Sequence, residues 1–326
     1  MNLGGTDFGK LWNSSGARGF FGDQDEYWYH RYWRRLGLDY DGYTFVAKTT
    51  TFLPCKGNMP LDARWRPKER CPRCIVVKPT AGVVLNAVGL SGPGFTPLLR
   101  TNKWQLRSKP FVLSYMATGV EHWEHRADAR VFAPALAREL PFFRAPVALE
   151  VNFSCPNVDH GANDPGNILD ILGMLRAGGV TCPLIPKFNA LEPVQTAVEV
   201  SESPLCSAVA VGNTIPWGRL PELIDWRGLF GSDISPLVHL GGGGLSGAPL
   251  LPLTVAWVTA ARHRVRKPLI AGGGVLSSRD ARVVLAAGAD ALEVGVVGML
   301  RPWRTRGIRK AVSPACSVRC EGCSCG

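Results

Sequence analysis

Polar side chains recur at the ends of short apolar runs in this sequence, and their chemical types suit the binding of a flat, charged ring. They comprise amides, two ammonium groups, a thiol and a hydroxyl: Lys48, Asn86, Asn152, Cys155, Asn157, Lys187, Asn213 and Thr214. Amide groups pair with the N–H and C=O groups of a heterocycle, and a lysine balances a negative charge. The set therefore indicates a site for a planar, anionic, nitrogen-containing molecule.

Glycines near the end of the sequence indicate a second kind of contact, with phosphate. Runs at 241–244 and 272–274 are followed by Gly295, and glycine lets backbone N–H groups approach an anion closely. Gly242, Gly244 and Gly247 also have the spacing of a dinucleotide fingerprint. However, no acidic residue that would bind a ribose lies between Gly247 and Asp280. We therefore predict a mononucleotide phosphate site and not a Rossmann fold.

Apolar, β-rich runs alternate with helical patterns along the chain. Seven of these runs occupy residues 44–47, 111–115, 147–151, 184–185, 208–211, 269–271 and 291–294, and we expect a first strand near Trp12. Strands that alternate with helices pair in parallel, and eight of them close a (β/α)8 TIM barrel. In such a barrel the reactive groups lie where strands end, which is where the polar set occurs. The sequence therefore predicts an α/β TIM barrel.

Helix ends and interruptions complete this organisation. Asp164 with Pro165 predicts a helix start, Ser277 with Asp280 predicts a capping box, and Gly288 predicts the end of that second helix. Residues 52–85 contain five prolines, so we expect an inserted loop or hairpin over the carboxyl-terminal face of the barrel. We expect one barrel domain over residues 1–310 and a Cys-rich tail over 311–326.

Composition narrows the setting of the protein. The 326 residues are 46% hydrophobic with a formal charge of +11, which is typical of a globular chain. Residues 240–260 are uncharged, but their glycines and prolines disfavour a spanning helix, so we predict a buried loop and helix start there and no membrane contact. Ten cysteines without a secretory signal favour reduced thiols and a cytoplasmic location. Arginine clusters at 31–35 and 301–310 are more typical of solvated helix faces than of a nucleic-acid site.

Several motifs, in register with the predicted strand ends, resemble the dihydroorotate dehydrogenase family. They are Lys48 to Thr51 with Lys56 to Asn58, Leu85 to Leu90, Asn152 to Asn157, Asn213 with Thr214, and Gly243 to Gly247. The resemblance runs in order from about Ser14 to Gly298. It implies flavin-dependent oxidation of dihydroorotate to orotate in de novo pyrimidine biosynthesis. Cys155 stands where the soluble class 1 branch has cysteine and the membrane-associated class 2 branch has serine.

The resemblance also implies roles for individual residues. Cys155 matches the base that removes a proton from C5 while a hydride leaves C6 for the flavin, and a thiol with a reference pKa of about 8.5 suits that task. Lys187 matches the lysine that stabilises negative charge on the flavin, and Lys48 matches one between flavin and substrate. The residues implied in substrate binding are Lys48, Asn86, Asn152, Asn157, Asn213 and Thr214. Those implied in FMN binding are Ser15, Gly16, Lys48, Lys187, Gly244, Gly273, Gly274 and Gly295.

Two Cys-x-x-Cys pairs have the spacing of zinc-ribbon half-sites. They are Cys71 with Cys74, and Cys320 with Cys323. The pairs lie far apart in the sequence and the second belongs to a short tail, so we assign no metal and keep these four residues as the candidates for one.

Other functions remain open on the sequence alone. One is a related FMN barrel reductase that acts on another dihydropyrimidine or on dihydrouridine in tRNA, and the tRNA substrate would account for the positive charge. Another is a barrel that binds flavin or pyrimidine without turnover. The electron acceptor is equally open between fumarate, NAD reached through an electron-transfer partner subunit, and another compound. The class 1 resemblance implies a homo-oligomer.

Overall fold

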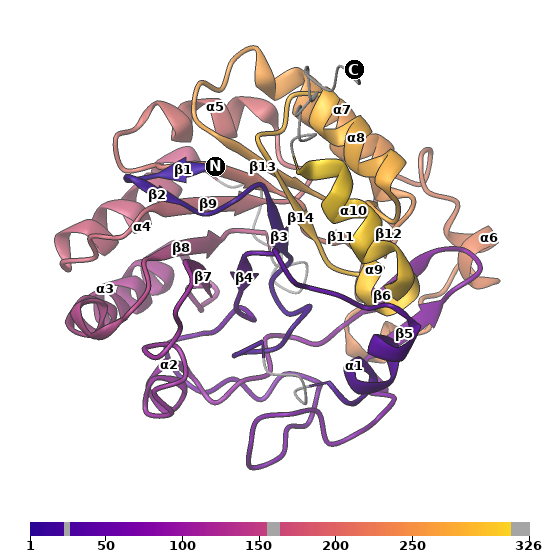
Figure 1. Ribbon diagram of the computed structural model, residues 1–326, viewed down its shortest axis with the longest axis horizontal. Helices are drawn as coiled ribbons and strands as arrows, with labels where there is room; N and C mark the ends of the chain where they lie inside the picture. Colours follow the sequence, from indigo (N-terminus) through magenta and orange to yellow (C-terminus); the bar gives the residue numbers. More distant parts are fainter. Residues whose placement is uncertain (23–26, 155–163, 314–326) are drawn as a thin grey trace, which may run out of the picture.

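The computed structural model describes residues 1–22, 27–154 and 164–313, and its centre is an eight-stranded parallel sheet (Figure 1). The strands, in their order around the sheet, are β3 (Leu11–Asn13), β14 (Ala291–Val294), β13 (Leu269–Gly272), β10 (Val209–Val211), β9 (Leu184–Phe188), β8 (Val147–Asn152), β7 (Phe111–Tyr115) and β4 (Phe45–Val46). A parallel bridge between Trp12 and Thr44 joins the two edges, with the Asn13 N–H donating to the Thr44 carbonyl at 3.1 Å. The predicted TIM barrel is confirmed, since all eight expected strands form and the sheet closes.

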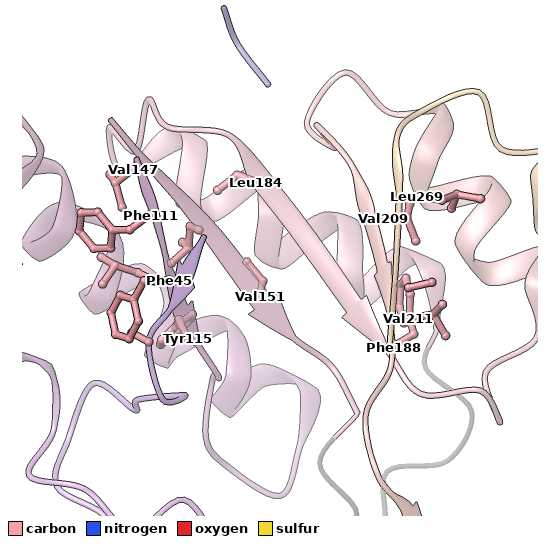
Figure 2. Packing of buried hydrophobic residues seen from close by; sticks show 14 of the residues in the cluster. Phe45, Phe111, Tyr115, Val147, Val151, Leu184, Phe188, Val209, Val211 and Leu269 are labelled. Atoms are coloured by element: carbon pink, nitrogen blue, oxygen red, sulfur yellow. The ribbon is translucent and has the colours of Figure 1, made fainter. Parts of the chain in front are cut away.

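Residues alternate between the two faces of each strand, and both faces are buried. One face packs against the helices; Figure 2 shows part of this outer layer, including Phe111, Leu184 and Val211. The other face fills the barrel with small or branched residues such as Val112 and Ala148. Because side chains alternate with a period of two, the next inward positions after these are the ones that carry polar groups.

Helices surround the strands (Figure 1). The longer ones are α3 (His122–Glu139), α4 (Pro165–Ala177), α5 (Val194–Glu202), α7 (Leu250–Arg262), α8 (Ser278–Ala286) and α10 (Thr305–Val312). The short ones are α1 (Trp28–Trp33), α2 (Phe95–Leu99), α6 (Trp226–Phe230) and α9 (Val297–Leu300). Within the described ranges, no helix is both long enough and apolar enough to cross a bilayer.

The helix ends largely follow the sequence signals. Asp164 caps α4, and its carboxylate accepts hydrogen bonds from the N–H groups of the second and third helical residues, with Pro165 as the first. Ser277 caps α8 by accepting from the Asp280 N–H at 3.2 Å. The Asp280 carboxylate, however, accepts from the Leu276 N–H at 2.9 Å and not from the cap residue, so the reciprocal half of the box is displaced by one residue.

A second sheet lies outside the barrel. Its four antiparallel strands, in order, are β11 (Ile215–Pro216), β12 (Gly244–Gly247), β6 (Val83–Asn86) and β5 (Ile75–Lys78). The segment 52–85 therefore contributes the hairpin β5–β6, as the prolines and the lack of a helical period indicate. The pairing of this hairpin with β12 was not predicted, because Gly-Leu-Ser-Gly is typical of a turn. At Gly247 a Cβ atom would lie 2.1 Å from the Gly82 carbonyl oxygen, so the close approach of β12 to the hairpin requires glycine.

The amino-terminal mouth of the barrel is closed by a small hairpin of β1 (Asn2–Leu3) and β2 (Thr6–Asp7). Leu3 and Phe8 are buried with the inward residues Trp12 and Val46. Among the described residues, the carboxyl-terminal end of the barrel is therefore the end that is open to a ligand.

Candidate functional site

A cavity of about 510 Å³ lies between the carboxyl ends of the barrel strands and the second sheet. Its volume falls within the usual range for a small-molecule site. Most of the predicted site residues line it: Ser15, Gly16, Lys48, Asn86, Asn152, Lys187, Asn213, Thr214, Gly273, Gly274 and Gly295. Residues from both halves of the chain therefore meet at one end of the barrel, as the strand-end argument predicts. Cys155 and Asn157 lie outside the described residues.

Gly244 is placed differently from the expectation that it contacts the cofactor. It is held within β12, where it pairs with Asn86 on one side and Pro216 on the other. Among the described residues, β12 contributes Ser246 and Gly247 to the cavity lining in place of Gly244. The difference arises because strand β12 begins at Gly244, the last glycine of the run 241–244.

Lys187 is the centre of a buried charge cluster on the cavity wall. Its Nζ atom lies 3.1 Å from Oε2 of Glu150 and 2.5 Å from Oε1 of Glu293. Burial alone would lower the pKa of Lys187, but the two carboxylates outweigh it and raise that pKa, so the side chain is an ammonium. Burial and the neighbouring Glu150 carboxylate raise the pKa of Glu293 to about 7, against the opposing effect of Lys187.

Hydrogen bonds continue from this cluster around the inside of the barrel. The Ser114 hydroxyl donates to Oε1 of Glu150 at 2.8 Å and lies 2.9 Å from the Thr49 hydroxyl, which in turn lies 2.7 Å from the Ser15 hydroxyl. The Ser15 N–H donates to Oε1 of Glu293 at 3.1 Å, which closes the circuit. We call the six connected residues the polar ring: Ser15, Thr49, Ser114, Glu150, Lys187 and Glu293. The ring fixes the position of the Lys187 ammonium from several strands at once.

The two glutamates of the polar ring were not predicted from the sequence. Each is a single acidic residue inside an otherwise apolar strand. Each points into the barrel two residues after an inward-facing alanine, Ala148 or Ala291. Acidic residues are rarely fully buried unless they are paired, so an acidic residue within a strand buried on both faces was the available signal.

A second polar cluster joins the ends of β8 and β10. The Asn213 side-chain amide donates to Oδ1 of Asn152 at 3.1 Å and to the Ser154 carbonyl at 2.9 Å. Oδ1 of Asn152 also accepts from the Ser154 N–H at 3.1 Å, and the Thr214 N–H donates to Oδ1 of Asn213 at 2.8 Å. These bonds set the orientation of both amides and hold the backbone at Ser154, the residue that precedes Cys155 in the sequence.

Lys48 supplies a second cation to the cavity. It follows β4 and is 7% exposed, and its Nζ atom donates to the Ser91 carbonyl at 2.8 Å. The ammonium also lies 5.1 Å from the centre of the Phe20 ring, a cation–π distance. Its position is therefore set by protein contacts before any ligand binds.

Glycines form another part of the cavity wall. Gly273 and Gly274 follow β13 with φ of +109° and +77°, and Gly295 follows β14. A Cβ atom at Gly274 would lie 2.3 Å from the Leu251 backbone nitrogen, so α7 packs directly onto this backbone. The wall presents peptide groups without side chains, which suits a phosphate. Together with the buried ammonium groups, this wall suits the cavity to an anionic ligand that carries a phosphate.

Aromatic residues of α1 and the residue before it line the apolar side of the cavity, a feature that the sequence did not indicate. They are Tyr27, Trp28, Tyr29 and Trp33. The Trp33 indole N–H donates to the Met299 carbonyl at 2.7 Å, which ties α1 to α9. The cavity thus has a polar end at the barrel and an aromatic end at α1.

The cysteine candidates for a metal are only partly described. Cys71 is exposed and lines the cavity, whereas Cys74 is fully buried and burial raises the pKa of its thiol, which disfavours the thiolate that a metal requires. Among the residues that the structure describes, no group of three or more His, Cys, Asp or Glu side chains could hold a metal ion. Cys320 and Cys323 lie outside those residues.

Comparisons with known proteins identify the family of this chain. The family model for dihydroorotate dehydrogenase matches residues 61–308. A dihydroorotate dehydrogenase A (fumarate) from Lacticaseibacillus paracasei is 33% identical over 77% of this chain and 77% of its own. The catalytic subunit of a dihydroorotate dehydrogenase B (NAD(+)) from Latilactobacillus sakei is 28% identical over 91% of this chain and 86% of its own.

A solved structure supports the fold independently. The Eimeria tenella dihydroorotate dehydrogenase in complex with ferulenol superimposes with a TM-score of 0.67 over 96% of this chain and 82% of its own, at 19% identity. Members of the matching family are oxidoreductases of pyrimidine biosynthesis that generally use a flavin. By its sequence match and its site, this chain belongs to the dihydroorotate dehydrogenase family.

Proposed function

We propose that this chain oxidises dihydroorotate to orotate with FMN as its cofactor. The observation that carries the proposal is the convergence, in one cavity, of the glycine wall, the Lys187 ammonium and the amide pair Asn152 and Asn213. A phosphate, a ring that gains negative charge on reduction and a pyrimidine require these three kinds of contact.

FMN, when bound, supplies the acceptor for a hydride. Gly273, Gly274 and Gly295 would hold its phosphate through backbone N–H groups. Lys187 would face the ring, where its ammonium stabilises the negative charge that arrives with the hydride. Because the polar ring already holds this ammonium in place, little reorganisation accompanies the reaction.

The pyrimidine would be held by the amides of Asn86, Asn152 and Asn213 and by Thr214, with Asn157 as a further member of the set. Each amide offers both a donor and an acceptor, which match the alternating N–H and C=O groups of the dihydroorotate ring. Lys48 would balance the substrate carboxylate from its place between substrate and flavin.

We assign the base to Cys155. Its thiolate would take the proton from C5 while the hydride leaves C6, so that the C5–C6 single bond becomes a double bond and dihydroorotate becomes orotate. The hydrogen bonds at Ser154 position the chain immediately before this residue.

Anaerobic mixing with dihydroorotate tests the proposal. We expect the absorbance of FMN-loaded protein to bleach, and we expect Cys155→Ala to slow bleaching by about 10²–10⁴-fold because a general base contributes that much. Cys206→Ala is the control, since this thiol is buried in the core away from the cavity and should leave the rate unchanged.

Each contrary result has a distinct meaning. Equal bleaching of wild type and Cys155→Ala would remove the cysteine from its role. A flavin that is bound but does not bleach would exclude dihydroorotate and favour another dihydropyrimidine or tRNA dihydrouridine.

We further propose a homo-oligomeric, cytoplasmic enzyme whose barrel domain spans 1–310, followed by the tail 311–326. The class 1 resemblance supports these assignments. It is compatible with fumarate, or with NAD reached through a partner subunit, as the final acceptor.

A further inference from the structure

Glu293 has an unusual hydrogen-bonding state for a buried acidic residue. Its Oε1 atom accepts from both the Lys187 ammonium and the Ser15 N–H, at 2.5 and 3.1 Å. Its Oε2 atom is buried and has no hydrogen-bond partner among the described residues. Glu293 also lines the cavity.

The second glutamate of the cluster shows the contrast. Oε1 of Glu150 accepts from the Ser114 hydroxyl and Oε2 accepts from Lys187, so both of its oxygens are satisfied within the protein. A buried, unpaired carboxylate oxygen is strongly unfavourable. Protonation of Glu293 reduces this penalty, because the cluster of one ammonium and two carboxyl groups then carries no net charge, and it leaves an O–H group that needs an acceptor.

Within residues 1–22, 27–154 and 164–313, Lys187 is the one cation that acts on Glu293. Glu150 faces it from β8 and Lys187 from β9, whereas the adjacent strands β3 and β13 approach it with Ser15 and Gly272. Lys48, after β4, lines the same cavity but is bonded to Ser91.

From this geometry we propose that Glu293 is a positioning residue that remains a carboxylic acid in the loaded enzyme and donates a hydrogen bond from Oε2 to an acceptor atom of the flavin ring. The inference rests on the proposed FMN site and assigns a protonation state to it. Burial and Glu150 raise the pKa of Glu293 to about 7 in the free protein, and a flavin acceptor would hold the proton more firmly still.

The dissociation constant of FMN, measured by quenching of flavin fluorescence across about two pH units on either side of neutrality, tests the inference. Glu293→Gln keeps an acceptor for Lys187 and places an amide N–H donor at the position of Oε2. We expect the ratio of the wild-type constant to the Glu293→Gln constant to be flat below neutrality and to rise about tenfold per pH unit above it. Titration of the FMN phosphate affects both constants equally, so it cancels in the ratio.

Glu150→Gln is a matched variant on the other side of Lys187. It removes the negative charge that raises the pKa of Glu293, so its FMN affinity should weaken from a lower pH than that of wild type while keeping the same slope. A pH-independent ratio for Glu293→Gln, or identical profiles for the wild type and Glu150→Gln, would overturn the inference.

Infrared spectra of the flavin-free protein separate this inference from the proposed function. We expect the C=O stretch of a protonated carboxyl below neutral pH in wild type and its loss in Glu293→Gln. If FMN fails to bind at every pH, the proposed cofactor is wrong, and with it the flavin hydrogen bond. The infrared titration then still decides the protonation state of Glu293, and absence of the band refutes it.

Discussion

Lys187 shows how a single residue links stability to function in this barrel. Its ammonium is buried between two carboxyl groups, and a buried charge left without its partner is far more unfavourable than the intact pair. The residue proposed to stabilise negative charge on the flavin therefore also supplies the positive charge of the polar ring.

Lys187→Met should destabilise the flavin-free protein by about 3–5 kcal/mol at slightly alkaline pH, because it leaves Glu150 and Glu293 without a cation. The loss should shrink as the pH falls through neutrality, since Glu293 is then protonated and one of the unpaired charges disappears. Urea unfolding at several pH values measures the change.

The control is the double variant Lys187→Met with Glu293→Gln, which removes one of the two charges left unpaired. It should recover part of the lost stability. Equal losses in the single and double variants would show that packing of the lysine stem, and not its charge, stabilises the barrel.

Site residues at strand ends could be predicted from the sequence, whereas those inside strands could not. Lys48, Asn152 and Asn213 stand where an apolar run stops, so their types were informative. Glu150 and Glu293 interrupt runs that read as apolar, and their pairing depends on a contact between strands that no local pattern encodes.

Among the secondary-structure elements, strands β7 and β14 form over the predicted bounds, whereas the second sheet was not foreseen. Alternating apolar residues identify a strand by themselves. The strand β12 is defined instead by its partner, because a glycine-rich segment becomes a strand only when a hairpin from residues 75–86 lies against it. Pairings between distant segments of this kind are not visible in a local window of sequence.

The contact between α7 and the glycine wall gives a prediction at this scale. Gly274→Ala should lower the free energy of unfolding by more than Gly218→Ala, because both have φ of +77° but only the first meets a neighbour. The shared backbone strain is about 1–2 kcal/mol, so the excess measures the clash with Leu251.

Thermal or urea unfolding of both variants provides the comparison, and FMN titration adds a second readout. Gly274→Ala should also weaken FMN binding, whereas Gly218→Ala, where a Cβ atom meets no neighbour within 4 Å, should not. Similar losses of stability in the two variants would mean that α7 shifts to accommodate the methyl group.

For the molecule as a whole, the protonation of Glu293 should appear in the dependence of stability on pH. A carboxyl whose pKa is raised on folding binds more protons in the native state than in the unfolded state, so stability falls as pH rises through that interval. Here the interval extends from the ordinary value near 4.5 to about 7.

The free energy of unfolding of the wild type should therefore fall relative to that of Glu293→Gln as the pH rises across this interval. The fall is at most about 1.4 kcal/mol per pH unit. Chemical denaturation at matched pH values measures it. Parallel curves for the two proteins would indicate that Glu293 titrates normally.

The closing of the barrel also has a consequence for how the chain is made. The polar ring joins Ser15 to Glu293, which are 278 residues apart, and β14 is the neighbour of β3 in the sheet. During synthesis the ribosome releases Ser15 and Lys187 long before Glu293, so a nascent chain can have most of the strands and still lack the last acidic partner of the ammonium. The cylinder is therefore completed only after β14 has been synthesised, and until then its first strand has an unpaired edge.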